Sequence, residues 1–130
     1  MKAGDLLQIA DWKTEKHVPV IDCPDAVKAD EMFDVKVTIG KEIAHPNTTE
    51  HHIRWIQVFF KPEDDKFPYQ VACVEFTAHG EAVAGPNQGP VHTHHGATIT
   101  MKTTKPGTLF AVSSCNIHGF WENSKAIKVS

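Results

Sequence analysis

The chain has 130 residues, 41% of them hydrophobic and 22% charged, which is typical of one soluble globular domain spanning residues 1–130. Thirteen basic and sixteen acidic residues give a formal net charge of -3, so no basic surplus favours nucleic acid or an anionic membrane surface as a partner. No apolar run approaches the roughly 18 residues that cross a bilayer, and the first residues are too charged for a signal peptide. We therefore expect a cytoplasmic protein without a nucleic-acid or membrane partner.

The predicted elements are almost all strands, because the hydrophobic pattern has mostly a period of two. "GDLLQIA" near the start is the one candidate for a short helical turn, and "WENS" is expected to be a turn before the last strand. In chain order, the predicted strands cover residues 34–40, 52–60, 70–80, 97–102, 108–114 and 126–130. Short strands separated by Pro and Gly predict an all-β fold, an immunoglobulin-like antiparallel β-sandwich of about seven strands.

Nine histidines in 130 residues are the anomaly of this composition. One group lies in residues 81–96, a stretch without periodicity that is rich in Gly and Pro and is predicted to be a long loop. His79 lies in "EFTAHGE", and the other five histidines lie in "TEKHVPVI", "AHPNTTEHHIRW" and "CNIHGFW". Taken alone, each of these stretches is compatible with an ordinary polar turn, and none has the spacing of a zinc protease.

Taken together, the three stretches predict a metal centre, because a β-sandwich brings loops from distant parts of the chain to one edge. They supply four imidazoles and one thiol, which is one ligand more than a closed tetrahedral zinc site uses. Imidazole suits iron, copper, zinc and nickel alike. The candidate ligands are His17, His45, His51, Cys115 and His118.

Two other classes stay open at this point. A blue-copper electron carrier is also a β-sandwich with an early His and a late Cys-His pair, but it normally adds a weak axial Met after that His. Here Met1, Met32 and Met101 all precede His118. The second class is a structural or interaction module that folds equally well without metal.

The segments "EKHVPVI", "GKEIAHPNTTEHHIRW", "EFTAHGE", "GPN" and "CNIHGFWE" resemble the superoxide reductases, in particular the one-iron neelaredoxin type. The resemblance extends over nearly the whole chain and keeps the order of the segments. It implies an enzyme that reduces superoxide to hydrogen peroxide by one electron, at a mononuclear non-haem iron.

The resemblance also implies a role for each matched residue. His17, His45, His51 and His118 match four equatorial ligands, and Cys115 matches an axial thiolate. Glu15 matches a carboxylate that can occupy the sixth position, and Lys16 matches a cation that attracts the anionic substrate. The resemblance further implies one iron ion per chain, a rubredoxin-like electron donor and a homotetramer.

This sequence departs from the family pattern at two places. After "GPN" it reads "QGPVHTHHG", so His92, His94 and His95 match nothing in the family and are expected to be an exposed loop with loose metal binding. Ser114 stands where many relatives have Tyr. Cys23 and Cys73 are expected to be ordinary buried or loop thiols.

Overall fold

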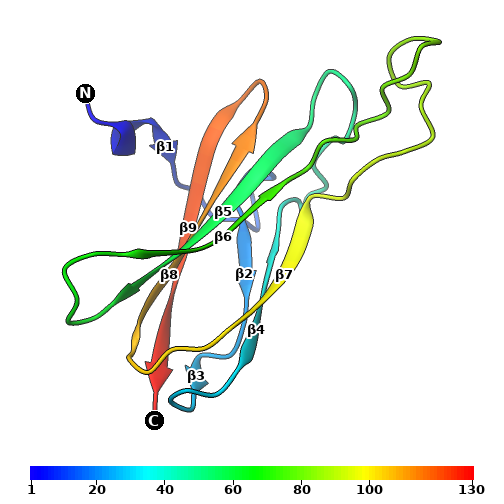
Figure 1. The fold of residues 1–130 in the computed structure, drawn as a ribbon. Helices are drawn as coiled ribbons and strands as arrows, with labels where there is room; N and C mark the ends of the chain where they lie inside the picture. The colour runs from blue at the N-terminus through cyan, green and yellow to red at the C-terminus, as the bar shows by residue number, and fades with distance from the viewer.

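The computed structural model describes all of residues 1–130, and its strands form two layers that face each other (Figure 1). The elements are the 3-10 turn η1 (Ala3–Leu6) and the strands β1 (Leu7–Gln8), β2 (Val20–Asp22), β3 (Ala26–Val27), β4 (Phe33–Thr38), β5 (Ile53–Pro62), β6 (Tyr69–Glu75), β7 (Gly96–Met101), β8 (Gly107–Cys115) and β9 (Gly119–Val129). The larger sheet has the order β1-β9-β8-β5-β6, with β3 also paired to β9. The smaller sheet has the order β2-β4-β7.

The long strands pair antiparallel with their neighbours throughout, and only the two-residue strands β1 and β3 pair parallel with β9. The prediction of an all-β antiparallel sandwich is therefore confirmed. The six predicted strands correspond to β4 to β9, and the sequence pattern missed β1, β2 and β3, which are only two or three residues long. A strand this short contains too few residues to display an alternation.

The core lies between the two layers and follows the alternation of the strands. In β4, Phe33, Val35 and Val37 are buried while Asp34 and Lys36 point to solvent. From the larger sheet, β5 and β8 contribute the other main side chains of a cluster of fourteen buried residues. Each fully buried aliphatic side chain stabilises the fold by about 1.5–3 kcal/mol relative to an exposed one.

One sequence prediction was wrong at the C-terminal end. "WENS" is not a turn but part of β9, where Trp121 pairs with Ser113 and Ser124 pairs with Phe110. The reversal lies a few residues earlier, between Cys115 and Gly119, which face each other across the end of the hairpin. Gly119 has φ +81°, a conformation that glycine adopts without steric cost, and this allows the tight reversal that lets the polar residues continue as strand.

A β-bulge interrupts β5 near its start, where the pairing with β8 shifts between Ile53 and Trp55. Bulges change the phase of the side chains and are common next to functional sites. Because of the shift, Ile53 and Ile56 both point into the core although they are three residues apart. The strand thus keeps one buried face across the bulge.

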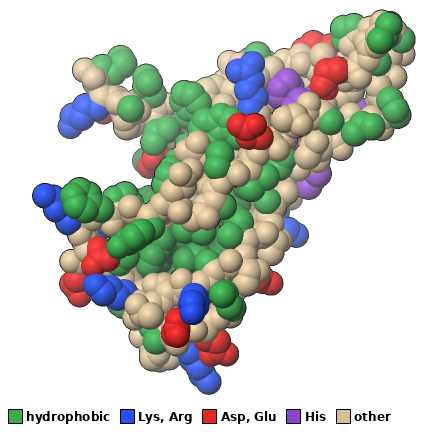
Figure 2. Space-filling model, in the orientation of Figure 1, with side chains coloured by type: hydrophobic (Ala, Val, Ile, Leu, Met, Phe, Trp, Pro, Cys, Tyr) green, Lys and Arg blue, Asp and Glu red, His purple; other side chains and the backbone are tan.

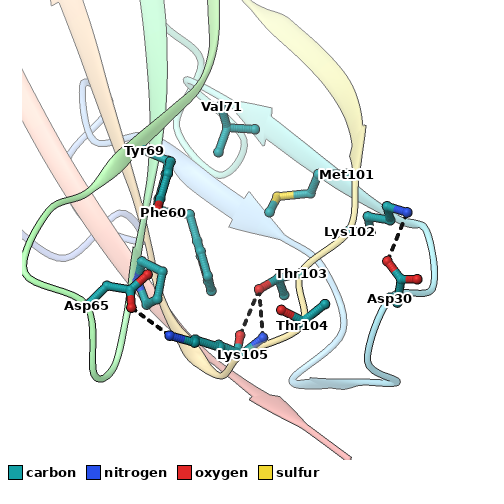
Figure 3. A pocket seen from close by; sticks show the side chains of 11 residues that line it. Asp30, Phe60, Asp65, Tyr69, Val71, Met101, Lys102, Thr103, Thr104 and Lys105 are labelled. Atoms are coloured by element: carbon teal, nitrogen blue, oxygen red, sulfur yellow. Dashed lines mark hydrogen bonds and ion pairs between the residues drawn. The ribbon is translucent and has the colours of Figure 1, made fainter.

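An open cleft of about 460 Å³ lies between β5, β6 and β7. It is at the end of the sandwich away from the start of β5. Figure 3 shows apolar side chains such as Phe60 and Met101 at its floor and ion pairs at its rim. Lys105 binds Asp65 at 2.7 Å, and Lys102 binds Asp30 at 2.9 Å. With a rise of about 3.3 Å per residue, Phe60 lies roughly 23 Å along β5 from the strand's first residue.

No helix in the structure has the length and apolar character needed to cross a membrane.

Candidate metal centre

The three histidine-bearing stretches meet at the end of the sandwich that is remote from this cleft. The first stretch leads into β2, the second leads into β5, and the third is the turn between β8 and β9. Cys115, the last residue of β8, lies opposite Ile53, the first residue of β5. Figure 2 shows histidine side chains, in purple, in the upper part of the visible face, above a hollow where hydrophobic side chains gather.

His17 is held firmly from both its backbone and its ring. Ser113 donates its hydroxyl hydrogen to the carbonyl oxygen of His17 at 3.0 Å. Oε1 of Glu15 accepts from the backbone N–H of His17 at 3.1 Å and from Nδ1 at 2.6 Å. These contacts fix the tautomer, so that Nε2 of His17 carries the free lone pair.

His45 is fixed in a comparable way by its own loop. Nδ1 donates to the carbonyl oxygen of Pro46 at 2.6 Å, which leaves Nε2 as the free nitrogen. The loop passes very close to Gly40, which has φ +76°, and a Cβ added there would lie 2.6 Å from the backbone nitrogen of His45. The positive φ and the close approach of His45 therefore both require glycine at position 40.

Four imidazole rings surround one point. The centroids of neighbouring rings lie 4.7–4.9 Å apart in the order His17, His118, His51, His45 and back to His17. Across this ring, the centroids of His17 and His51 lie 6.1 Å apart. Four sides of nearly equal length and a longer diagonal describe an approximately square arrangement.

The ring nitrogens at the centre of this square face one another. Nδ1 of His118 lies 3.2 Å from Nε2 of His17 and 3.1 Å from Nε2 of His51. Two nitrogen ligands that sit about 2.1 Å from one metal ion, at right angles, are about 3.0 Å apart. The spacing of the nitrogens therefore fits a common metal ion.

The thiol of Cys115 joins this group. Its Sγ lies 3.7 Å from Nδ1 of His118, and the donor atoms of His17, His45, His51 and Cys115 all lie within 4.8 Å of one another. Cys115 is buried, with 3% of its surface exposed. The predicted set of four histidines and one cysteine is thus brought together in space.

Burial favours the neutral form that a metal ligand needs for three of these imidazoles, those of His17, His45 and His51. It lowers the pKa of His45 to about 3. Burial also lowers the pKa of His17, against the opposing effect of Glu15, and lowers that of His51, together with the charges of His118 and His17. Nε2 of His45 is the one buried side-chain nitrogen or oxygen with no hydrogen-bond partner. Such an orphan costs about 1–3 kcal/mol unless a ligand takes its lone pair.

Glu15 and Lys16 lie at the rim of the group, both half-buried. Burial raises the pKa of the Glu15 carboxyl, but the hydrogen bonds from His17 outweigh it and the net pKa is lowered. Glu15 therefore carries its negative charge against His17. The charge of Lys16 acts on His17 and His51, whose pKa values it helps to lower after the larger effect of burial.

Trp121 is a member of this site that the sequence reasoning missed. Its ring stacks on His17, with centroids 5.0 Å apart and planes inclined by 14°. Its Nε1–H donates to the carbonyl oxygen of His118 at 3.1 Å. The sequence signal is the aromatic residue in "HGFW", three positions after His118.

The other histidines do not belong to the converging group, although His95 packs against one of its members. His52 stacks on His79, with centroids 3.6 Å apart. The expectation of an exposed loop was wrong for His95, which is 5% exposed and whose ring meets that of His45 edge-on at 5.7 Å. His92 and His94 are exposed, as expected. Cys23 is half-buried and Cys73 is exposed on β6, and both are free thiols.

The fold and the site together define a class: a β-sandwich protein with a histidine- and thiol-lined metal centre at one end. The comparisons with known proteins then identify the family. The desulfoferrodoxin family model matches residues 9–124, and the chain belongs to this family.

Its relatives include neelaredoxin of Megalodesulfovibrio gigas, which is 65% identical over 127 residues and 98% of each chain. The superoxide reductase of Pyrococcus furiosus is 53% identical and covers 96% of this chain and 98% of its own. The structure of the reduced neelaredoxin of Archaeoglobus fulgidus matches with a TM-score of 0.88 at 52% identity, over 95% of this chain and 98% of that one. These matches confirm the expected resemblance to the neelaredoxin-type superoxide reductases, and with it the expectation of an oxidoreductase.

Proposed function

We propose that this protein is a superoxide reductase that converts superoxide to hydrogen peroxide at a mononuclear non-haem iron. The reaction consumes one superoxide anion, one electron and two protons for each hydrogen peroxide. The observation that carries the proposal is the square of four imidazoles beside a buried thiol. When bound, the iron would supply the electron to superoxide and be reduced again by an external donor.

In this proposal, each chain binds one iron ion through five residues of its own. The nitrogen ligands are Nε2 of His17, His45 and His51 and Nδ1 of His118, and the thiolate of Cys115 is the fifth ligand. Five protein ligands leave one position free in an octahedral arrangement, and an open position is typical of catalytic sites. The thiolate donates electron density and thereby tunes the metal, as an axial cysteine does in haem enzymes.

Lys16 and Glu15 are proposed to act on the substrate side of the centre. The chain is net acidic, with a formal charge of -3, so a local cation is needed to attract an anion. Two unit charges about 4 Å apart attract by about 1 kcal/mol in water and several-fold more in a partly desolvated pocket. Glu15 holds His17 in the tautomer that binds metal, and by the family resemblance it is proposed to be the carboxylate that would occupy the sixth position.

The partners of this enzyme are proposed from its surface. A one-electron carrier of the rubredoxin type can approach the turn around His118, where Ile117 is 59% exposed.

We propose that the chain forms a homotetramer. An apolar groove on the outside of the larger sheet supports self-association, and Phe59 and Phe110 are paired there across β5 and β8. Residues 1–130 are proposed to form one domain, and three free thiols favour a cytoplasmic location.

The decisive experiment compares the wild type with Cys115→Ser and uses Cys73→Ser as the matched control. Purified protein is assayed for bound metal, for its visible spectrum before and after oxidation, and for superoxide consumption with a reduced donor. The wild type should contain one iron per chain and show a charge-transfer band when oxidised. The band should disappear in Cys115→Ser and persist in Cys73→Ser.

Other results would favour the competing classes. Stoichiometric copper without superoxide consumption would indicate an electron carrier. A colourless zinc protein would refute the iron proposal. A chain that folds with equal stability without metal, and whose His45→Ala variant is unchanged in every assay, would indicate a structural module. Light scattering of the wild type and Phe110→Glu tests the assembly.

A further inference from the structure

The segment that carries His51 is a tight turn closed by its first residue. The hydroxyl of Thr48 donates to the carbonyl oxygen of His51 at 3.2 Å and accepts from the backbone N–H of His51 at 3.0 Å. The backbone N–H of Thr48 also donates to the carbonyl oxygen of His51 at 2.9 Å. Residues 48–51 therefore move as one unit, and whatever holds this turn also sets the position of His51.

The "GPN" segment grips this turn from one side through Asn87. Oδ1 of Asn87 accepts from the backbone N–H of Thr49 at 2.8 Å, and its backbone N–H donates to the hydroxyl of Thr49 at 3.1 Å. Nδ2 of Asn87 donates to both carboxylate oxygens of Glu50, at 2.7 and 2.9 Å. Asn87 has φ +60°, and Asn is among the few residues that tolerate this conformation.

Asn116, the neighbour of Cys115, grips the same turn from the other side. Its Nδ2 donates to the carbonyl oxygen of Glu50 at 2.8 Å, and its Oδ1 accepts from the backbone N–H of His52 at 2.9 Å. Its backbone N–H donates to the carbonyl oxygen of His52 at 3.1 Å. The two asparagines thus form a clamp with Glu50 between them.

The ring of His51 lacks the hydrogen bond to its second nitrogen that orients His17 and His45. Glu15 fixes Nδ1 of His17 and Pro46 fixes Nδ1 of His45, whereas no protein group hydrogen-bonds Nδ1 of His51. The partners that orient a metal ligand usually bond its second ring nitrogen. For His51 the orienting contacts are instead made by the backbone on either side of it.

We propose that Asn87 and Asn116 are positioning residues of the metal centre, and that the Asn87–Glu50 contact holds His51 where it can bind the metal. The proposal rests on the proposed function for the identity of the metal, but its geometry is independent of that identity. It gives the "GPN" segment a physical role, because Asn87 reaches across from a loop 37 residues further along the chain to the turn that precedes β5.

The test measures how fast the loaded protein loses metal to a chromogenic chelator, with Fe²⁺ and, in parallel, with Zn²⁺. Asn87→Gly keeps the positive φ without strain but removes the clamp, and should release metal about tenfold faster. Asn87→Asp places a carboxylate against Glu50 and should release it at least as fast. The double variant Asn87→Asp with Glu50→Gln reverses donor and acceptor, and should return most of the way to the wild-type rate.

Asp30→Gly is the matched control. Asp30 also has a positive φ, +63°, and also makes a side-chain contact, with Lys102, but at the other end of the sandwich. The control should release metal at the wild-type rate, even where the thermal midpoint of the metal-free protein falls.

The proposal is overturned if Asn87→Gly and Asp30→Gly release metal equally fast, or if the double variant stays as fast as Asn87→Asp. A wild type that binds Zn²⁺ but yields no iron-thiolate band refutes the proposed function instead. In that case the Zn²⁺ release rates still decide the role of the clamp.

Discussion

Two groups of histidines lie at this end of the molecule, the four candidate ligands and the stacked pair of His52 and His79. Their ring nitrogens are directed differently. In the centre, Nε2 of His17, Nε2 of His51 and Nδ1 of His118 point at one another, and Nε2 of His45 is buried without a partner. A metal ion binds unprotonated ring nitrogens whose lone pairs point at one position. The centre provides this arrangement.

The outer pair, His52 and His79, has its nitrogens directed elsewhere. Nδ1 of His52 bonds the carbonyl oxygen of Thr48 at 2.9 Å, and Nε2 of His79 bonds that of Phe76 at 2.7 Å. The two rings stack face to face, with planes inclined by 6°. The direction of the free lone pairs, and not the number of histidines, therefore defines the candidate site.

The largest expected difference between the two groups is in metal binding. His45→Ala removes a converging lone pair and should lower metal affinity by more than the roughly 10- to 100-fold that an outer partner costs. His79→Ala should retain one metal per chain and lose only about 1–3 kcal/mol of stability from its buried hydrogen bonds. Metal analysis after gel filtration checks both variants. Equal metal loss from both would contradict the assignment of His45, and not His79, to the metal centre.

A smaller effect is expected at Trp121, which touches the centre without pointing a lone pair into it. Trp121→Leu removes both the stack on His17 and the hydrogen bond to His118, and should speed metal release by about tenfold. Trp121→Phe keeps an aromatic ring against His17 and should lie between this variant and the wild type. Stopped-flow chelation measures the three rates. Identical rates would show that Trp121 does not help to hold the metal.

The buried histidines should also make the stability of the metal-free protein depend on pH. Burial lowers the pKa of His79 below its ordinary value, although a hydrogen bond to Phe76 opposes the shift. Between the lowered pKa and the usual value of about 6.5, the unfolded chain binds more protons than the folded one. The stability is therefore complete above about pH 6.5 and is lost as the pH falls through that window.

The buried His45 and His95, whose pKa values burial lowers to about 3 and about 4, contribute to the same loss. Urea denaturation of the metal-free chain at several pH values should show stability falling with acid, and a shallower fall in His79→Gln. A stability that rises as the pH drops would contradict this account.

The smallest effect is expected at the exposed end of the histidine-rich loop. His92→Ala and His94→Ala should leave the stoichiometric metal unchanged, because neither side chain belongs to the converging group. They should remove only weakly bound excess metal. Titration with Zn²⁺ after the centre has been filled distinguishes the two populations.

Much of the fold could be predicted because the strands alternate cleanly. Val35 and Val37 point inward between Asp34 and Lys36, and residues 34–40 were predicted as a strand for this reason. "WENS" misled the prediction because its polar residues resemble a turn, whereas the hairpin pairing with β8 keeps them in β9. His95 was misplaced because nothing local distinguishes it from exposed His94.

The sequence by itself determined the kinds of ligand, their order along the chain and the alternation that makes a sandwich, since residue type and periodicity are local properties. The tertiary structure added which nitrogen of each ring faces the common point and what holds it there. The free lone pairs of His17, His45 and His51 depend on contacts with Glu15, Pro46 and the clamp of Asn87 and Asn116. The contacts of Glu15 and Pro46 are local, one or two residues from the ligand, whereas those of Asn87 and Asn116 reach Glu50 from 37 and 66 residues away and exist only once the chain has folded.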